Sequence, residues 1–318
     1  MKNFEELYQE LQNTGKQELE EVWKKSKEEK KKANKISIIV CLIIDLIIIA
    51  FVISGGGLSG FPFGIMFILP ILVFNVIISL IITAIFSKNQ NKYTEKYKSI
   101  IINKMIENFY DSLEYFPNKQ MPSRIYDEVG YNESYNRYYS DDYFEAKINN
   151  KYDIGMAEVT TKKVETRTDS KGRTHTTTYL RFSGLFAKIV IDKSINSEVS
   201  IRKNGALSFS KNKLEMDSGE FEKYFDVSAS DKIKGMQLLT ADVMEELIEF
   251  ENKTNIQYEI TIRDNYIYLR FHSGTMFEPK QNKNEVLDKK SIQSYFYMLN
   301  FTYNLSNKLI NLIHETEF

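Results

Sequence analysis

Cysteine and histidine are scarce in this sequence. It contains one cysteine, Cys41, and three histidines that are far apart, His175, His272 and His314. A single cysteine excludes a disulfide framework and an all-cysteine metal site. The sequence also lacks a glycine-rich phosphate loop and the HExxH, CxxC and GxSxG patterns of common zinc, redox and hydrolase sites. We therefore predict no cofactor, no metal ligand and no catalytic residue.

Charge is nearly absent from one stretch of the chain. Residues 36–86 contain a single charged residue, Asp45, although 42 basic and 43 acidic residues occur in the 318. Two apolar runs, 36–53 and 62–86, are separated by the glycine-rich residues 54–61. Each run is long enough to cross a hydrocarbon core of about 30 Å as a helix. We predict two transmembrane helices joined by a short external loop, and no cleaved signal peptide, because 35 mostly polar residues precede the first run.

Basic residues flank the apolar runs on the side away from this loop. Residues 24–35 contain seven lysines and two glutamates, and residues 87–98 contain four lysines and one glutamate. This asymmetry predicts a cell-membrane protein with both termini in the cytoplasm. The first group is also a candidate for contact with anionic lipid head groups, although a topology signal explains it equally well. Its members are Lys24, Lys25, Lys27, Lys30, Lys31, Lys32 and Lys35.

Two polar residues, Asp45 and Asn75, lie near the middle of the predicted spans. In an antiparallel hairpin they would meet near the bilayer midplane, within reach of a mutual hydrogen bond. An ionisable group at that depth suggests a functional site. A protonated Asp45 held by Asn75 or by a second subunit would instead stabilise helix packing. We favour packing, because two spans alone offer no pathway, and we keep an oligomeric transport or channel accessory as an alternative function.

The remaining residues predict an α+β fold, organised in four parts. Residues 1–35 form a charged cytoplasmic helix, residues 87–116 an amphipathic stalk helix, residues 117–142 a connector and residues 143–318 a cytoplasmic domain. In that domain an antiparallel sheet has flanking helices, because strand patterns and helix patterns occur in runs. Its first hairpin joins arms at 152–168 and 173–191, and the polar residues near the turn indicate a tip that projects into solvent.

Two stretches of the domain resemble a known family. They are Phe182-Ser-Gly-Leu-Phe186 and Glu220-Phe-Glu-Lys-Tyr-Phe-Asp-Val227, the latter followed by Thr240. With Glu158 in Ala-Glu-Val and the two predicted spans, they resemble the bacterial membrane family called domain of unknown function 3137. The resemblance implies a two-span hairpin with a cytoplasmic domain and assigns no reaction. Two positions depart from the family pattern. The pattern has proline where this chain has Ala241, and a small residue followed by arginine where this chain has Gly235-Met236.

We interpret the residues of these motifs as structural. Gly184 permits a bulge or a close approach of the backbone, and the aromatic residues can insert into the core. The residues so assigned are Glu158, Phe182, Gly184, Leu185, Phe186, Phe221 and Phe225.

The sequence as a whole predicts a non-enzymatic anchoring or interaction module of the cell envelope. Its partners would be the lipid bilayer and another protein or a second copy of the chain. Nucleic acid is excluded as a partner because residues 87–318 contain 33 basic and 34 acidic residues. An enzyme with an unrecognised site is the second alternative.

Overall fold

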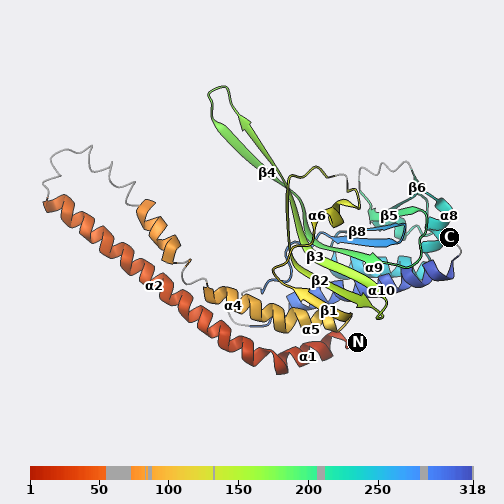
Figure 1. The fold of residues 1–318 in the computed structure, drawn as a ribbon, viewed down its shortest axis with the longest axis horizontal. Coiled ribbons are helices and arrows are strands. Elements are labelled where there is room, and N and C mark those ends of the chain that lie inside the picture. Colours follow the sequence, from red (N-terminus) through yellow and green to blue (C-terminus); the bar gives the residue numbers. More distant parts are fainter. Residues whose placement is uncertain are drawn as a thin grey trace. The chain divides into compact units, whose positions relative to one another are not determined.

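The fold is described by a computed structural model in which two compact units are distinguished. The structure describes residues 1–54, 73–82, 84, 88–131, 133–205, 212–279 and 286–316 (Figure 1). The smaller unit comprises Gln9–Ile100 and Gln281–Leu287. The larger unit comprises Met1–Tyr8, Ile101–Lys280 and Asp288–Phe318.

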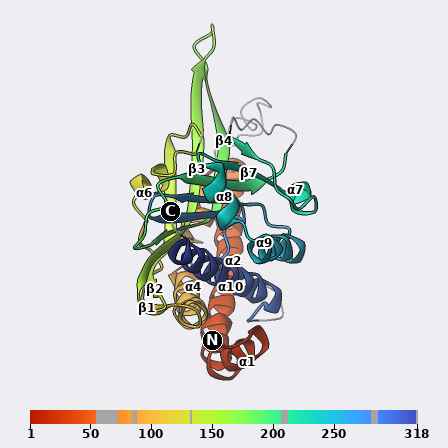
Figure 2. The same cartoon turned by 90° about the vertical axis from the view of Figure 1, so that its right-hand side faces the viewer.

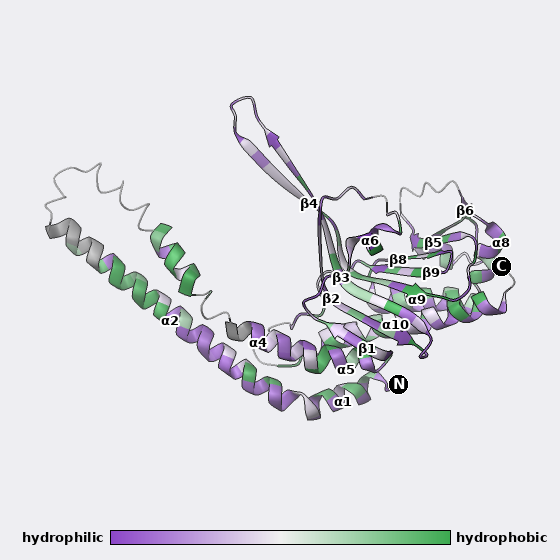
Figure 3. Ribbon diagram, in the orientation of Figure 1, coloured by the Kyte–Doolittle hydropathy of each residue, from purple (hydrophilic) through white to green (hydrophobic). Residues whose placement is uncertain are grey.

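Helix α2 (Lys16–Ser54) dominates the smaller unit and follows α1 (Phe4–Thr14) after a break at Gly15. Its composition changes along its length from hydrophilic to hydrophobic (Figure 3). Helix α4 (Lys88–Tyr97) lies beside it, where Lys96 Nζ is 2.9 Å from a carboxylate oxygen of Glu18. Among the described residues, no helix combines the length and the apolar character needed to cross a membrane.

The predicted membrane hairpin therefore stays a prediction. The predicted loop at 54–61 lies outside the described residues except for Ser54, and so does much of the predicted second span. Residues 73–82 of that span are helical.

The stalk helix predicted over 87–116 ends earlier than expected. After α4, a π-helical segment (Lys98–Ile102) leads into α5 (Asn103–Glu107), and strand β1 (Asp111–Phe116) begins four residues later. Ser112 has a φ of 51°, which a right-handed helix does not allow. Leu113 continues the four-residue spacing of Phe109 and also alternates with Tyr115, so it fits a helix and a strand, and pairing with β2 decided the outcome.

The connector predicted over 117–142 is also partly structured. It contains the short helix α6 (Ser123–Asp127), and its last six residues begin strand β2 (Arg137–Ile148). The sheet therefore begins well before residue 143, where the sequence placed the start of the domain.

Nine described strands form one antiparallel sheet in the order β1-β2-β3-β4-β9-β8-β5-β7-β6. The strands not yet bounded are β3 (Tyr152–Thr168), β4 (Thr174–Val190), β5 (Glu198–Lys203), β6 (Lys213–Leu214), β7 (Phe225–Ala229), β8 (Tyr258–Arg263) and β9 (Tyr266–Phe271). The helices among them are α7 (Phe221–Tyr224), α8 (Lys232–Leu238), α9 (Ala241–Thr254) and α10 (Lys289–Glu315). The predicted α+β class, with an antiparallel sheet and flanking helices, is confirmed.

The two faces of the sheet have different covers. Helices α9 and α10 lie together over one face, which we call the α10 face (Figure 2). There the rings of Phe250 and Phe301 stack with centroids 4.0 Å apart and adjoin Phe271 of β9. The opposite face, the α6 face, carries Tyr126 of α6 against Phe186 of β4, with centroids 5.1 Å apart. Aromatic rings are therefore buried on both faces of the sheet, together with many aliphatic side chains.

Candidate functional site

Strand β2 contains one residue more than its partner β3 near Asp141. Asp141 pairs with Glu158 and Phe144 with Met156, so three steps along β2 match two along β3. Asp142 lies inside this bulge, and its φ is 49°. In a regular strand, neighbouring side chains point to opposite faces. The bulge instead lets Asp141 and Asp142 approach Glu158 together, as bulges beside functional sites often do.

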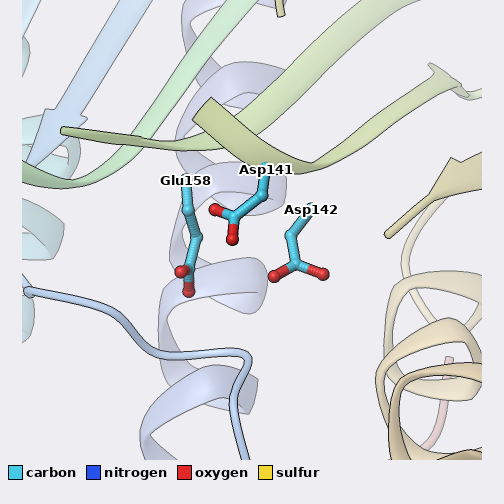
Figure 4. A group of neighbouring side chains, drawn as sticks. All are labelled: Asp141, Asp142 and Glu158. Atoms are coloured by element: carbon cyan, nitrogen blue, oxygen red, sulfur yellow. The ribbon is translucent and has the colours of Figure 1, made fainter. Parts of the chain in front are cut away.

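The three carboxylates converge on the α10 face (Figure 4). One oxygen from each of Asp141, Asp142 and Glu158 lies within 4.8 Å of the others. Asp142 and Glu158 are buried, whereas Asp141 is exposed. The Tyr115 hydroxyl donates to Asp142 Oδ1, and the Asp142 N–H donates to the carbonyl of Pro117 at 3.1 Å. Asp142 is thus held in place from β1 and from the chain that follows it.

Glu158 is fixed by the segment between β9 and α10. The backbone N–H groups of Met276 and Phe277 both donate to Glu158 Oε1, each at 2.6 Å. The Glu158 side chain is 3% exposed, and its second oxygen, Oε2, has no hydrogen-bond partner. One carboxylate oxygen is therefore fully occupied, and the other is buried without a donor.

Burial raises the pKa of Glu158 to about 7, and the negative charges of Asp142 and Asp141 act in the same direction. The two backbone donors oppose this shift without cancelling it. Burial also raises the pKa of Tyr115, aided by its contact with Asp142. The cluster thus concentrates negative charge in a place that disfavours it.

A second buried network lies on the α6 face around Arg270 of β9. Its guanidinium donates to Glu133 Oε1 at 2.7 Å and to Glu259 Oε1 at 3.0 Å. It also lies over the ring of Tyr131, 3.9 Å from the centroid, which is a cation–π geometry. Arg270 is 4% exposed, so its charge is compensated inside the protein. The network ties the chain after α6 to β9 and β8, and we interpret it as structural.

A hairpin arm, which we define as residues 162–181, extends β3 and β4 beyond the rest of the sheet (Figure 1). All residues from Lys171 to Arg181 are exposed, which confirms the predicted solvent-exposed tip. The β3–β4 register gains one residue at Arg181, because Thr161 pairs with Phe182 and Lys162 with Leu180. This bulge marks the base of the arm.

One edge of the arm is open. Strand β4 pairs with β9 only from Leu185 onward, so its residues 174–182 have no described strand on that side. On the other edge, the Asn136 side chain exchanges two hydrogen bonds of 2.8 Å with the backbone of Val164. The backbone N–H and C=O of Val164 therefore point away from β4. Val164 and Thr178 are thus a pair without hydrogen bonds between them, so the N–H of Thr178 points to the open edge.

The family-motif residues lie in the core or between strands. Phe182 and Phe186 pack on Tyr126 on the α6 face, and Leu185 is fully buried. Gly184 lies where β4 meets the end of β9, and a Cβ there would be 1.8 Å from the carbonyl oxygen of Phe271. Phe221 and Phe225 contact each other with centroids 5.1 Å apart, and both are buried.

In the smaller unit, Asn75 Nδ2 donates to Asp45 Oδ1 at 2.7 Å. The two residues named as a polar pair are therefore in contact, while their place in a membrane stays a prediction. Among the candidate lipid-binding lysines, Lys25 pairs with Glu21 at 2.8 Å and Lys27 lies over the ring of Trp23. Contact of these lysines with lipid also stays a prediction.

Three residues of these sites were missed by sequence reasoning. Asp141 and Asp142 belong to the connector predicted over 117–142, so no strand partner was predicted for them. Arg270 was missed although its cross-strand partner Glu259 is only 11 residues away, and its other partner, Glu133, is distant in the chain. Glu158 was singled out, but by its motif and as a structural residue.

Comparison with known proteins identifies a family resemblance. Residues 180–310 match a family model described as "Protein of unknown function (DUF3137)". The predicted resemblance is confirmed. The match includes the motifs at 182–186 and 220–227 but not the carboxylate cluster, and the family description assigns no activity.

The other comparisons add little. No curated protein matches the chain. A solved structure, that of the mycobacterial trehalose monomycolate transport factor A, TtfA, matches with a TM-score of 0.37 and 7% sequence identity. The match covers 68% of this chain and 95% of that one.

Proposed function

We propose that this protein is a membrane-anchored interaction module that binds a protein partner through its hairpin arm. The open edge of β4 carries this proposal. An exposed strand edge presents unpaired N–H and C=O groups and readily accepts a further strand. Folded proteins usually cover, shorten or interrupt such edges, whereas here the edge is extended beyond the sheet on an arm.

The smaller unit would supply the anchor. Twelve large apolar side chains of α2 and residues 73–82 are exposed, which is far more than scattered surface residues account for. They are Ile36, Ile38, Ile39, Leu42, Ile43, Leu46, Val73, Phe74, Val76, Ile77, Leu80 and Ile81. Their exposure supports a lipid-facing role, and the flanking lysines favour a cytoplasmic location for the larger unit.

The charge of the arm indicates the kind of partner. Residues 162–181 contain six basic and two acidic residues, although the whole chain has a net charge of -1. Both acids are paired within the arm, Glu165 with Lys163 at 2.9 Å and Asp169 with Arg173 at 2.9 Å. The surplus positive charge favours an acidic extended segment of another protein, because complementary charge speeds and orients association.

The experiment places a photo-crosslinking amino acid at Tyr179, on the exposed arm, in the full chain in its own membranes. The matched control carries the same probe at Met236, a comparably exposed residue of α8. We expect an adduct with an acidic protein at position 179 and none at position 236.

Two further variants test strand addition itself. Thr178→Pro removes the N–H on the open edge and should abolish the adduct, while Thr178→Val retains it and should leave the adduct intact. Equal adducts at both probe positions, or an adduct that survives Thr178→Pro, would refute the proposal. An adduct between two copies of this chain would show that the arm binds a second copy of the chain and not another protein.

A further inference from the structure

We propose that Asp141, Asp142 and Glu158 bind a divalent cation of the hard, oxygen-seeking class, Ca²⁺ or Mg²⁺. The site lies at the bulge in β2 and beside it on β3, the strand whose continuation forms one side of the hairpin arm. It is separate from the anchor and from the open edge of the arm, so it goes beyond the proposed function.

The buried oxygen of Glu158 is the observation that points to a ligand. Oε2 belongs to a side chain that is 97% buried and has no hydrogen-bond partner, while Oε1 already accepts two backbone N–H groups. The backbone donors therefore fix the carboxylate, and one of its oxygens lies within 4.8 Å of an oxygen of each aspartate (Figure 4). A buried polar atom left without a partner is costly, and a bound cation would satisfy it.

The electrostatics of the cluster agree with a cation. The charged side chains that act most strongly on Glu158 are Asp142 and Asp141, both negative. Like charges that face each other across a strand pair destabilise the sheet unless something neutralises them. The bulge brings a third carboxylate to this cross-strand pair instead of separating the charges.

The donor set and its spacing define the ion. Three carboxylates offer oxygen only, which suits Ca²⁺ and Mg²⁺ and disfavours thiolate-preferring or imidazole-preferring metals. Oxygens within 4.8 Å of one another span the distance between opposite ligands of Ca²⁺, whose bonds are about 2.4 Å long. Mg²⁺, with bonds of about 2.1 Å, would require the carboxylate oxygens to move slightly closer together. The exposed side of Asp141 leaves room for water to complete either shell.

Cation binding would link three segments that are far apart in sequence. Asp141 and Asp142 belong to β2, Glu158 belongs to β3, and its backbone donors lie between β9 and α10. Tyr115 of β1 holds Asp142 from the other side. A bound ion would therefore fix the base of the hairpin arm.

The test uses the purified full chain in detergent, stripped of metal with a chelator. Tb³⁺ replaces Ca²⁺ in oxygen sites and luminesces when a nearby tyrosine is excited, so Tyr115 serves as the built-in sensitiser. We expect saturable Tb³⁺ luminescence that added Ca²⁺ or Mg²⁺ displaces, and a higher unfolding temperature with the tighter of these two ions. The order of displacement tells which of the two the site prefers.

Four variants locate the binding. Asp141→Asn, at the exposed position, should weaken Tb³⁺ binding about tenfold or more without unfolding the protein, and Asp142→Asn and Glu158→Gln should abolish it. Asp153→Asn is the matched control, because Asp153 is an exposed carboxylate on the same strand as Glu158. Binding that is absent from the wild-type chain, or that is equal in Asp141→Asn and Asp153→Asn, would overturn the proposal.

Discussion

Gly184 shows what one missing side chain contributes at the scale of a residue. The carbonyl oxygen of Phe271 occupies the space that a Cβ would need, and that oxygen belongs to the backbone and cannot rotate away. Strands β4 and β9 can approach at this point only because the residue is glycine. The adjoining Phe182 and Phe186 then reach the same face of the sheet.

We predict that Gly184→Ala lowers the free energy of unfolding by at least about 2 kcal/mol, because the backbone of β4 or β9 must move. Gly219→Ala is the control, since a Cβ at Gly219 meets nothing within 4 Å. Its expected effect is within about 0.5 kcal/mol. Chemical denaturation of the full chain, followed by circular dichroism, compares the two. A stability of Gly184→Ala equal to that of the control would contradict the close approach.

The Arg270 network makes a prediction about pH. Burial favours protonation of Glu259, but the nearby His272, whose Nε2 lies 3.6 Å from Glu259 Oε1, and the charge of the hydrogen-bonded Arg270 outweigh it and lower the pKa of Glu259. Because this pKa is lower in the folded state, the ionised Glu259 stabilises the fold at pH values above its unfolded pKa of about 4.5. This stabilisation is lost as the pH falls through the pKa of the folded state. Glu133 and Tyr126 share the same arginine and keep it paired.

We therefore expect Glu259→Gln to lower the free energy of unfolding by about 1–3 kcal/mol at pH 7. The difference from the wild-type chain should shrink as the pH falls below about 4.5. Denaturation curves between pH 3 and pH 7 measure it, with the exposed Glu249→Gln as control. A difference that grows towards acid pH would show that the sign is wrong.

At the scale of elements, the two neighbouring helices α8 and α9 begin in different ways. Asp231 accepts hydrogen bonds from the N–H groups of Ile233 at 3.0 Å and Lys234 at 3.3 Å, and so caps α8. Thr240 occupies the corresponding position of α9. Its hydroxyl donates to Asp242 instead, at 2.5 Å, and accepts no backbone hydrogen bond.

We predict that Asp231→Ala costs about 1 kcal/mol of stability, the usual value of an N-terminal cap, and that Thr240→Ala costs less. Asp231 and Thr240 precede the neighbouring helices α8 and α9, so each substitution serves as the control for the other in one denaturation series. A larger loss in Thr240→Ala would mean that its bond to Asp242 matters more than capping.

How much of each element could be predicted depended on how local its signal was. The arms of the first hairpin were placed to within a few residues, because alternation and the turn at 169–172 are local. Strand β1 was taken for the end of a helix, since Leu113 lies four residues after Phe109 as well as two before Tyr115, and only pairing with β2 distinguishes the two structures. The carboxylate cluster was missed because Asp141 and Asp142 were placed in the connector, and only the pairing of β2 with β3 brings them to Glu158.

At the scale of the whole molecule, the proposed anchoring fixes which side of the membrane each part occupies. The single native cysteine makes this testable, because Cys41→Ala gives a background without thiols. In that background, Lys171→Cys marks the tip of the hairpin arm and Gly57→Cys marks the predicted external loop.

We predict that a membrane-impermeant maleimide labels Lys171→Cys only in inside-out vesicles and Gly57→Cys only in right-side-out vesicles. Labelling of both sites in detergent is the control for reactivity. The reverse pattern would invert the proposed topology, and labelling of both sites from one side would rule out a membrane-spanning hairpin.

The extra residue at Asp142 has one more consequence, for the order in which β2 presents its side chains. Tyr138 and Tyr143 face the same side of the sheet, although one position is even and the other odd. The bulge therefore shifts the alternation of side chains by one residue. Residues 137–141 follow one phase of the alternation, and the residues after the bulge follow the other. A relative that lacked Asp142 would keep both sides of β2 as they are, because removing the extra residue restores regular pairing with β3, but it would lose one of the three carboxylates.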